Sequence, residues 1–172
     1  MLDEKEFLSD YGIRAMSKVY EKTPFVFSVH DHQYVVHYTP GESDSSMFGG
    51  NSNWRGPIWF PINFLIVESL QRFHFYYGDS LQVELPTGSG AYITLDEVAE
   101  NLSDRLESIF LEDKNGNRPF NGGVKKFNKD PYFKNYIMFN EYFHGDNGRG
   151  MGASHQTGWT ATVAKLMQVR AN

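Results

Sequence analysis

The hydrophobic positions of this 172-residue chain predict two well-defined helices. A helix should begin after Thr94, because Thr94-Leu95-Asp96-Glu97 has the form of a capping box. Apolar residues then recur on one face with charges opposite, at Leu95, Val98, Leu102, Leu106 and Ile109. Pro61 to Tyr77 is apolar almost all round, and Pro61 suits the first turn of a helix. We expect the first of these helices to lie on the outside and the second to be buried between other elements.

Weaker patterns predict two more helices. Ser9 is a plausible N-cap for a helix from about Asp10 to Glu21, in which Ile13, Met16 and Tyr20 share one face. A last helix should run from roughly Thr157 to Val169, with Trp159, Val163, Leu166 and Met167 on one side.

The remaining segments predict a hairpin and ordered loops. Phe25–Val29 and Gln33–Tyr38 are rich in β-branched and aromatic residues and flank His30-Asp31-His32, so they should pair as a β-hairpin. Residues 40–53 consist largely of Gly, Ser, Asp and Asn, which predicts an ordered loop. Repeated turn signals break the chain between Glu112 and Asp130.

Buried and amphipathic helices that alternate along the chain, with glycine-rich loops between them, are typical of a double ring of helices. The fold class is therefore expected to be mainly α, a partial (α/α) toroid with a small β-hairpin. Four helices cannot close such a ring, and no repeat at a solenoid period is present. We therefore expect residues 1–172 to form a single, incomplete domain, the C-terminal portion of a larger toroid.

Composition and charge narrow the class of function. The chain has 40% hydrophobic and 22% charged residues and a net charge of −5. No basic cluster exceeds Lys125-Lys126, which argues against nucleic acid as a partner and favours neutral ligands. Cysteine is absent, so neither a disulfide framework nor a thiolate zinc site can form.

Targeting signals are also lacking in the sequence. Residues 1–6 are charged where a signal peptide would be apolar, and no stretch approaches 18 uninterrupted apolar residues. No membrane partner is therefore expected, and the cytoplasm is the expected location.

Two segments distant in sequence contain the candidate chemistry. The first is Asn53-Trp54-Arg55-Gly56-Pro57-Ile58-Trp59. The second begins at Asn140-Glu141-Tyr142 and continues through a glycine-rich loop to His155-Gln156-Thr157-Gly158-Trp159-Thr160. Each places indole rings beside a charged group and glycines, which suits stacking of a sugar ring and presentation of a carboxylate to it. We interpret the segments as two walls of one carbohydrate site.

Several of these residues keep two interpretations. Trp54 and Trp59 could form a sugar platform or belong to the core. Arg55 could bind sugar hydroxyls or serve as a structural ion-pair partner. His155, like His144, flanks the glycine loop and could contact substrate or support the loop. Glu42 could order its loop through hydrogen bonds.

Metal and cofactor sites are not expected. His30, His32 and His37 alternate along a hairpin, but they supply no fourth ligand for a metal. Asp146 and Asn147 lack the alternating oxygen ligands that calcium sites use.

The combination of Asn53–Trp59, Glu141-Tyr142, Gly145–Gly152 and Thr157-Gly158-Trp159-Thr160 resembles the C-terminal part of glycoside hydrolase family 63. This family is the processing α-glucosidase I and mannosylglycerate hydrolase group. The likeness spans nearly the whole chain and is strongest with bacterial glucosidase-like members. It implies an (α/α) six-hairpin toroid that cleaves α-glycosidic bonds with inversion.

By this resemblance Glu141 matches the general base, and Trp54 and Arg55 match a substrate-site strip. Trp159 matches the Gly-Trp that begins the final inner helix. The expected substrate-binding set is completed by Gly56, Trp59, Tyr142 and His155. The family's general acid is an Asp in the preceding part of the toroid, and no position here corresponds to it.

Because inversion requires two carboxyl groups, two hypotheses stand. The chain is either part of an inverting α-glycosidase that acts on an oligosaccharide or small glycoside, or a non-catalytic sugar-binding remnant. The first hypothesis implies a partner, the N-terminal remainder of the toroid in the same or another chain. The faces left without this partner should form an apolar patch and favour self-association.

Overall fold

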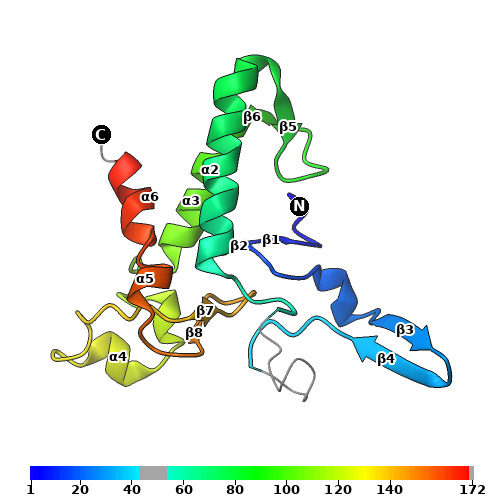
Figure 1. Cartoon of the computed structure of the whole chain (residues 1–172). Helices are drawn as coiled ribbons and strands as arrows, with labels where there is room; N and C mark the ends of the chain where they lie inside the picture. Colours follow the sequence, from blue (N-terminus) through cyan, green and yellow to red (C-terminus); the bar gives the residue numbers. More distant parts are fainter. Residues whose placement is uncertain (43–53, 171–172) are drawn as a thin grey trace.

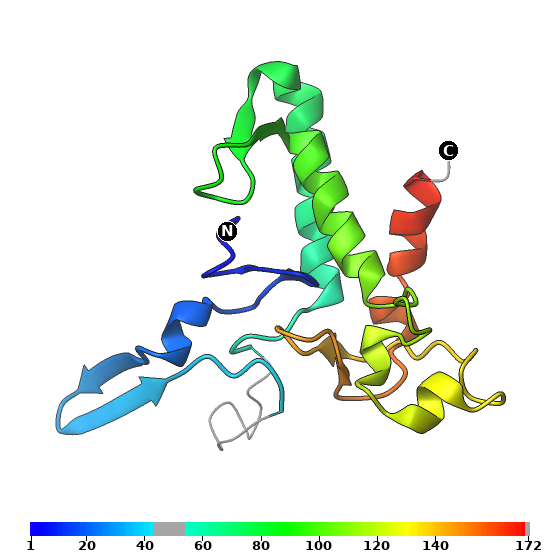
Figure 2. The ribbon, with the colours of Figure 1, turned by 180° about the vertical axis from the view of Figure 1, so that it is seen from behind.

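The computed structural model describes residues 1–42 and 54–170, and a pair of antiparallel helices forms its centre. These helices are α2 (Phe60–Tyr77) and α3 (Leu95–Ser108). They are connected at one end by the short helix η2 (Gly78–Ser80) and the hairpin of β5 (Gln82–Glu84) with β6 (Tyr92–Thr94). In Figures 1 and 2 the helix α6 (Val163–Arg170) lies on the other side of α3 from α2.

Short elements gather at the opposite end of this helix pair (Figure 1). They include two small hairpins, β1 (Leu8–Ser9) with β2 (Gly12–Ile13) and β7 (Tyr142–Phe143) with β8 (Gly150–Met151). They also include three short helices, η3 (Pro119–Asn121), α4 (Lys125–Lys129) and α5 (Thr157–Thr160). The hairpin of β3 (Phe25–Val29) with β4 (His32–Val36) projects to one side, beyond the short helix η1 (Lys18–Glu21).

The fold class is mixed rather than mainly α. Among the described residues, helices account for 36% and strands for 17%, so the mainly-α expectation is corrected. The strands form small antiparallel hairpins whose residues are close in sequence. This content is consistent with a C-terminal domain of the family that the sequence resembles, and the six-hairpin toroid stays a prediction.

The amphipathic helix is confirmed in detail. The Thr94 hydroxyl accepts the Glu97 N–H, and the Glu97 carboxylate accepts the Thr94 N–H at 2.7 Å, which completes the capping box. All five members of the predicted stripe are buried, whereas Glu100 and Asp104 on the opposite face are exposed. The apolar face of α3 packs against α2 and α6, as its periodicity requires.

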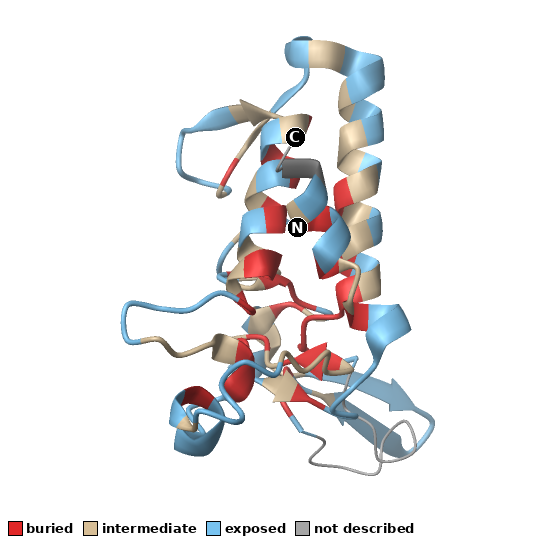
Figure 3. Cartoon of the chain, turned by 90° about the vertical axis from the view of Figure 1, so that its left-hand side faces the viewer, coloured by how far each residue is buried: buried red, intermediate tan, exposed pale blue. Residues whose placement is uncertain are grey.

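Helix α2 has the predicted bounds but not the predicted burial. Its buried residues are Phe60, Asn63 and Val67, whereas Leu65 is 60% and Phe75 93% exposed. Figure 3 shows that much of this helix is not buried. The prediction of all-round burial is wrong for the described chain because α3 covers one flank of α2 and leaves other flanks open.

The helix predicted from Asp10 to Glu21 is wrong. Gly12, with a φ of 128°, lies in the hairpin formed by β1 and β2, and the Ser9 hydroxyl accepts the N–H of Tyr11. The Ile13 N–H donates to the side-chain oxygen of Asn63 in α2 at 2.7 Å, so a tertiary hydrogen bond replaces a helical one. A single short turn of helix follows, η1, with Ser17 as its N-cap.

Three other segments agree in part with the elements predicted from the sequence. The β-hairpin is confirmed, with Val29 opposite His32 and a positive φ of 51° at His30. The last helix is divided into α5 and α6, and α4 interrupts the segment expected to consist of turns. Most of the loop predicted at residues 40–53 lies outside the described residues, as does Asn53.

Asn63 is a polar residue in the core that fastens the N-terminal hairpin to α2. Its side-chain amide donates to the carbonyls of Ile13 and Trp59, each at 3.0 Å, and its Oδ1 accepts the Ile13 N–H. The surrounding core includes Leu8, Ile58, Leu106 and Phe143. Asn63 therefore satisfies backbone groups that are removed from water.

No helix among the described residues has both the length and the apolar character required to cross a bilayer.

We predict that Asn63→Leu lowers the free energy of unfolding by about 3 kcal/mol. Leucine has a similar size but leaves the N–H and C=O of Ile13 without their partner in the core, and each such group costs roughly 1 to 3 kcal/mol. Urea denaturation measures the change. Ser69→Ala, an exposed site on the same helix, is the control and should change stability by less than about 0.5 kcal/mol. Equal effects of the two substitutions would contradict this role of Asn63.

Candidate functional site

A backbone pair joins the two segments that the sequence singles out. The Ile58 N–H donates to the Phe143 carbonyl at 2.8 Å, and the Phe143 N–H donates back to the Ile58 carbonyl at 3.0 Å. Ile58 also bridges to Arg14, so its short segment lies between the N-terminal and C-terminal parts of the chain. This pairing holds the next residue of the first segment, Trp59, beside Tyr142 of the second.

Four aromatic rings meet at this junction, and we call them the aromatic cluster: Trp54, Trp59, Tyr142 and Trp159. The Trp54 and Trp59 rings are stacked, with centroids 4.5 Å apart and planes 6° apart. Trp59 also stacks on Tyr142 at 5.2 Å and meets the edge of Trp159 at 5.9 Å. The structure thus brings together rings from residues 54–59, 142 and 159.

Exposure divides the aromatic cluster into an inner and an outer pair. Trp59 and Tyr142 are buried, whereas Trp54 is 50% and Trp159 40% exposed. Trp59 therefore supports the aromatic cluster from within, and both outer indoles are partly accessible to solvent. Contact of both outer rings with Trp59, stacked for Trp54 and edge-on for Trp159, gives them a fixed orientation.

Glu141 lies beside the aromatic cluster and is fixed by three hydrogen bonds. Its N–H donates to the Ala153 carbonyl at 2.9 Å, and its Oε2 accepts the Ala153 N–H at 3.0 Å. The indole N–H of Trp159 donates to the Glu141 carbonyl at 3.0 Å. Within the described residues, the second carboxylate oxygen, Oε1, accepts no hydrogen bond from protein, so it is available to a ligand or to water.

Gly152 allows this approach of the carboxylate to the backbone. Its φ is 65°, and a Cβ at this position would lie 2.6 Å from Glu141 Oε2. Any larger residue would displace the carboxylate or the loop. The glycine-rich loop therefore has a steric function at this position.

Tyr142 stays protonated over the ordinary pH range. Burial raises the pKa of its hydroxyl to about 12, and the negative charges of Glu42 and Glu141 act in the same direction. Glu42 therefore lies near this part of the site, which its sequence context alone does not indicate.

Arg55 and Gly56 are buried residues that lie between Trp54 and Trp59 in the sequence, and we call these two residues the frame. Arg55 is 2% exposed, and its carbonyl accepts the N–H of Thr39. Gly56 has a φ of 144°, and a Cβ on it would lie 2.5 Å from the ring of Tyr38. These contacts hold the first segment against the chain that precedes it.

His155 is the one predicted site residue with a ring that does not belong to the aromatic cluster. It is exposed, and its ring lies 5.6 Å from that of Phe139. Among the described residues, no group of three or more His, Cys, Asp or Glu side chains is arranged to hold a metal ion.

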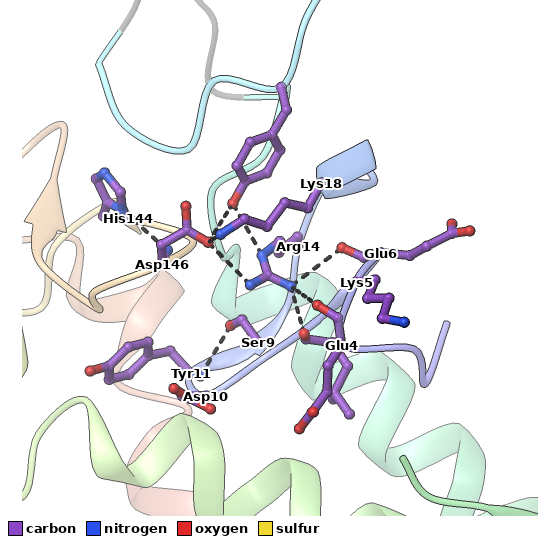
Figure 4. Close-up of polar contacts among 12 residues, drawn as sticks. Glu4, Lys5, Glu6, Ser9, Asp10, Tyr11, Arg14, Lys18, His144 and Asp146 are labelled. Atoms are coloured by element: carbon purple, nitrogen blue, oxygen red, sulfur yellow. Dashed lines mark hydrogen bonds and ion pairs between the residues drawn. The ribbon is translucent and has the colours of Figure 1, made fainter. Parts of the chain in front are cut away.

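Sequence reasoning missed a charged network centred on Asp146, in the glycine-rich loop of the second segment (Figure 4). One oxygen, Oδ1, accepts hydrogen bonds from Lys18 at 2.8 Å, Tyr38 at 3.0 Å and Arg14 at 3.1 Å. The Arg14 side chain also donates to the Leu8 carbonyl at 2.5 Å. The donors come from positions more than 100 residues away, so no local pattern could reveal the network.

The pKa values of Asp146 and His144 are shifted in this network. Burial alone would raise the pKa of Asp146, but hydrogen bonds from Lys18 and Tyr38 and the charges of Lys18 and Arg14 outweigh it and lower this pKa. Burial lowers the pKa of His144, whose Nδ1 accepts the Asp146 N–H at 3.1 Å. The folded state therefore favours a charged Asp146 and a neutral His144.

A carboxylate fixed beside partly exposed indoles is an arrangement typical of carbohydrate-processing proteins. The comparison with known families agrees. Residues 1–115 match the glycosyl hydrolase family 63 C-terminal domain, and the chain belongs to this family.

Two relatives come from Saccharomyces cerevisiae. The chain is 60% identical over 167 residues to the uncharacterized protein YMR196W, a match that covers 96% of this chain and 15% of that protein. It is 24% identical over 168 residues to mannosyl-oligosaccharide glucosidase, a match that covers 97% of this chain and 14% of that protein. Both matches extend past the family-model range and include the segment from Asn140 to Trp159. The chain spans about 15% of the length of these relatives.

We predict that the stabilising effect of Asp146 disappears in acid. Because the folded-state pKa lies below the ordinary value, the contribution is fully present above that value, 3.8, and is lost as the pH falls through the folded pKa. Asp146→Asn should lower the free energy of unfolding by about 1.5 to 3 kcal/mol at pH 7. The difference between wild type and variant should shrink below about pH 4.

Thermal unfolding between pH 3 and pH 8 tests this prediction, with Asp31→Asn at the exposed hairpin tip as the control. A difference for Asp146→Asn that stays constant down to pH 3 would show that charge is not the source of the effect.

Proposed function

We propose that the chain supplies the general base and the sugar-binding aromatic rings of an inverting α-glycosidase. One observation supports this most directly: Glu141 keeps a carboxylate oxygen available beside the exposed indoles of Trp54 and Trp159. Membership of glycosyl hydrolase family 63 supports the class of reaction. The relative named mannosyl-oligosaccharide glucosidase supports a glucoside as the substrate.

In this proposal Glu141 is ionised and holds a water molecule through Oε1. The hydrogen bond from Ala153 fixes the other oxygen, so the carboxylate cannot rotate away from the water. The water attacks the anomeric carbon while a carboxylic acid on the opposite face protonates the leaving oxygen. The two carboxyl groups of inverting enzymes stand roughly 6.5 to 9.5 Å apart, which leaves room for the water.

In this proposal the aromatic cluster orients the sugar ring. A sugar ring presents an apolar face of C–H groups, which packs on an indole, while its hydroxyls remain at the edge. Trp54 and Trp159 would contact the sugar, and Trp59 and Tyr142 would hold these two rings in place. Arg55 and Gly56 would contribute through the frame, and His155 would contact more distant parts of the substrate.

The general acid is proposed to come from a polypeptide that completes the toroid, in the same or another chain. The open side of α2 supports such a partner, because Ile62, Leu65 and Phe73 are at least half exposed. These residues line a shallow apolar groove together with Met1 and Leu70. Exposed apolar surface of this kind marks an interface.

We predict that the completed enzyme loses turnover when Glu141 is replaced by Gln. Glutamine keeps the shape of glutamate but cannot accept the proton of the attacking water, so kcat should fall by about 10² to 10⁴ while KM changes little. Glu100→Gln on the exposed face of α3 is the matched control and should leave kcat unchanged.

Steady-state kinetics with an α-glucoside and proton NMR of the first-formed sugar provide the readout. Inverted configuration with a collapsed kcat is the expected result. A retained anomer, or near-normal kcat in the Glu141→Gln enzyme, would remove Glu141 from this role. Sugar binding without any turnover in the completed protein would favour the sugar-binding alternative.

We also predict that the isolated chain is inactive and self-associates through the open side of α2. Leu65→Lys together with Phe73→Lys should lower both the associated fraction and the binding of a hydrophobic dye, because charges replace exposed apolar contacts. Leu111→Lys, at a 52% exposed site elsewhere, should change neither. Sedimentation velocity measures association, and a monomer at high concentration that binds no dye would contradict the prediction.

A further inference from the structure

Residues 113–129 and the loop that joins β7 to β8, both in the lower part of Figure 1, line a cleft. Its volume of about 740 Å³ is in the range of small-ligand sites. The chain has a net charge of −5, yet positive side chains outnumber negative ones in this cleft. We call it the basic cleft, and its charged lining residues are Arg118, Lys125, Lys129, Arg149 and Asp113.

Two of the four cations are already balanced by carboxylates. Arg118 forms an ion pair with Glu112 at 3.0 Å. Backbone hydrogen bonds from its own turn lower the pKa of Asp113, and the charge of Lys129 acts in the same direction. Among the described residues, the other two positive charges of the cleft have no balancing carboxylate.

These two cations, Lys125 and Arg149, are accompanied by neutral donors. In the part of the chain that the structure describes, neither side chain has a hydrogen-bond or ion-pair partner. Asn128 is 7% exposed, and its Oδ1 accepts two hydrogen bonds, whereas its Nδ2 donates to no described group. The N–H of Gly123, which has a φ of 75°, likewise donates to no described carbonyl. All four residues line the basic cleft.

Donors without acceptors, beside two unbalanced positive charges, indicate an anionic ligand. A phosphate monoester carries roughly 1.5 to 2 negative charges near pH 7 and three strong acceptor oxygens, which matches two cations and donors from several directions. A carboxylate has a single charge and two oxygens in one plane. A nucleic-acid backbone requires basic groups along an extended stripe, which a chain of this charge does not supply.

The basic cleft also has apolar surface, because Tyr11 and Pro119 contribute to its lining. Both lie against Gly148, where a Cβ would be 2.7 Å from the Tyr11 ring and 3.1 Å from the Cβ of Pro119. A phosphate group alone fills only part of the volume. The remaining space and this apolar surface suit the organic part of a monoester.

We propose that the basic cleft is a binding site for a phosphate group. Lys125 and Arg149 pair with its charge, and Asn128 and Gly123 donate to its oxygens. The site is separate from the proposed function of Glu141 and does not depend on it.

Isothermal titration calorimetry on the full chain at constant ionic strength tests the proposal with glycerol 3-phosphate, inorganic phosphate and acetate. Wild type should bind glycerol 3-phosphate saturably at a single site. Lys125→Met and Arg149→Met should each weaken this binding about tenfold, because each removes a charge-assisted hydrogen bond. Lys126→Met is the matched control. This neighbouring lysine lies over the ring of Phe133 and does not line the cleft, so the affinity should change less than about twofold.

The three probes identify the ligand. Tighter binding of glycerol 3-phosphate than of inorganic phosphate supports an ester, and equal binding of the two supports free phosphate at the same site. Acetate that binds as tightly as the phosphates would overturn the phosphate site, and so would the absence of saturable binding of both phosphates. Equal losses in Lys125→Met and Lys126→Met would show general electrostatic attraction and also overturn it. Glu141→Gln should bind the phosphates like wild type, so either proposal can fail without the other.

Discussion

The candidate site depends on one short backbone pairing, the two hydrogen bonds between Ile58 and Phe143. These residues are 85 positions apart in the sequence, and both side chains are fully buried. Burial protects the two hydrogen bonds from water, and the bonds in turn fix the flanking residues. The adjacent Trp59 and Tyr142 are thereby held face to face.

A second constraint fixes the same junction from the N-terminal side. The Ala15 N–H donates to the Pro57 carbonyl, while the neighbouring Arg14 donates to Asp146 in the glycine-rich loop of the second segment. Three distant parts of the chain are thus tied together by backbone pairing and by one carboxylate that accepts three donors.

The sequence predicted what local patterns can encode. The capping box at Thr94, the apolar stripe of α3 and the limits of α2 follow from nearby residues, and the structure has them. The predicted helix at Asp10–Glu21 failed because Gly12 and the hydrogen bonds of Asn63 impose a hairpin there. Tertiary contacts of this kind override weak helix propensity.

The sequence also predicted part of the candidate site. Sequence reasoning placed Trp54, Trp159 and Glu141 in one site, and the structure brings them together. It did not place Arg55 in a buried frame or His155 outside the aromatic cluster, because burial depends on packing partners that the local sequence does not specify. The Asp146 network was missed for the same reason.

The composition of the aromatic cluster has a spectroscopic consequence. All three tryptophans of the chain belong to it, and two of them are stacked in near-parallel planes. Among protein side chains, indoles absorb at the longest wavelengths of the near-ultraviolet, so the circular dichroism at that end of the spectrum reports on this one location. A change in that signal therefore reports a change in the geometry of the candidate site, whereas the ten tyrosines and fourteen phenylalanines contribute at shorter wavelengths.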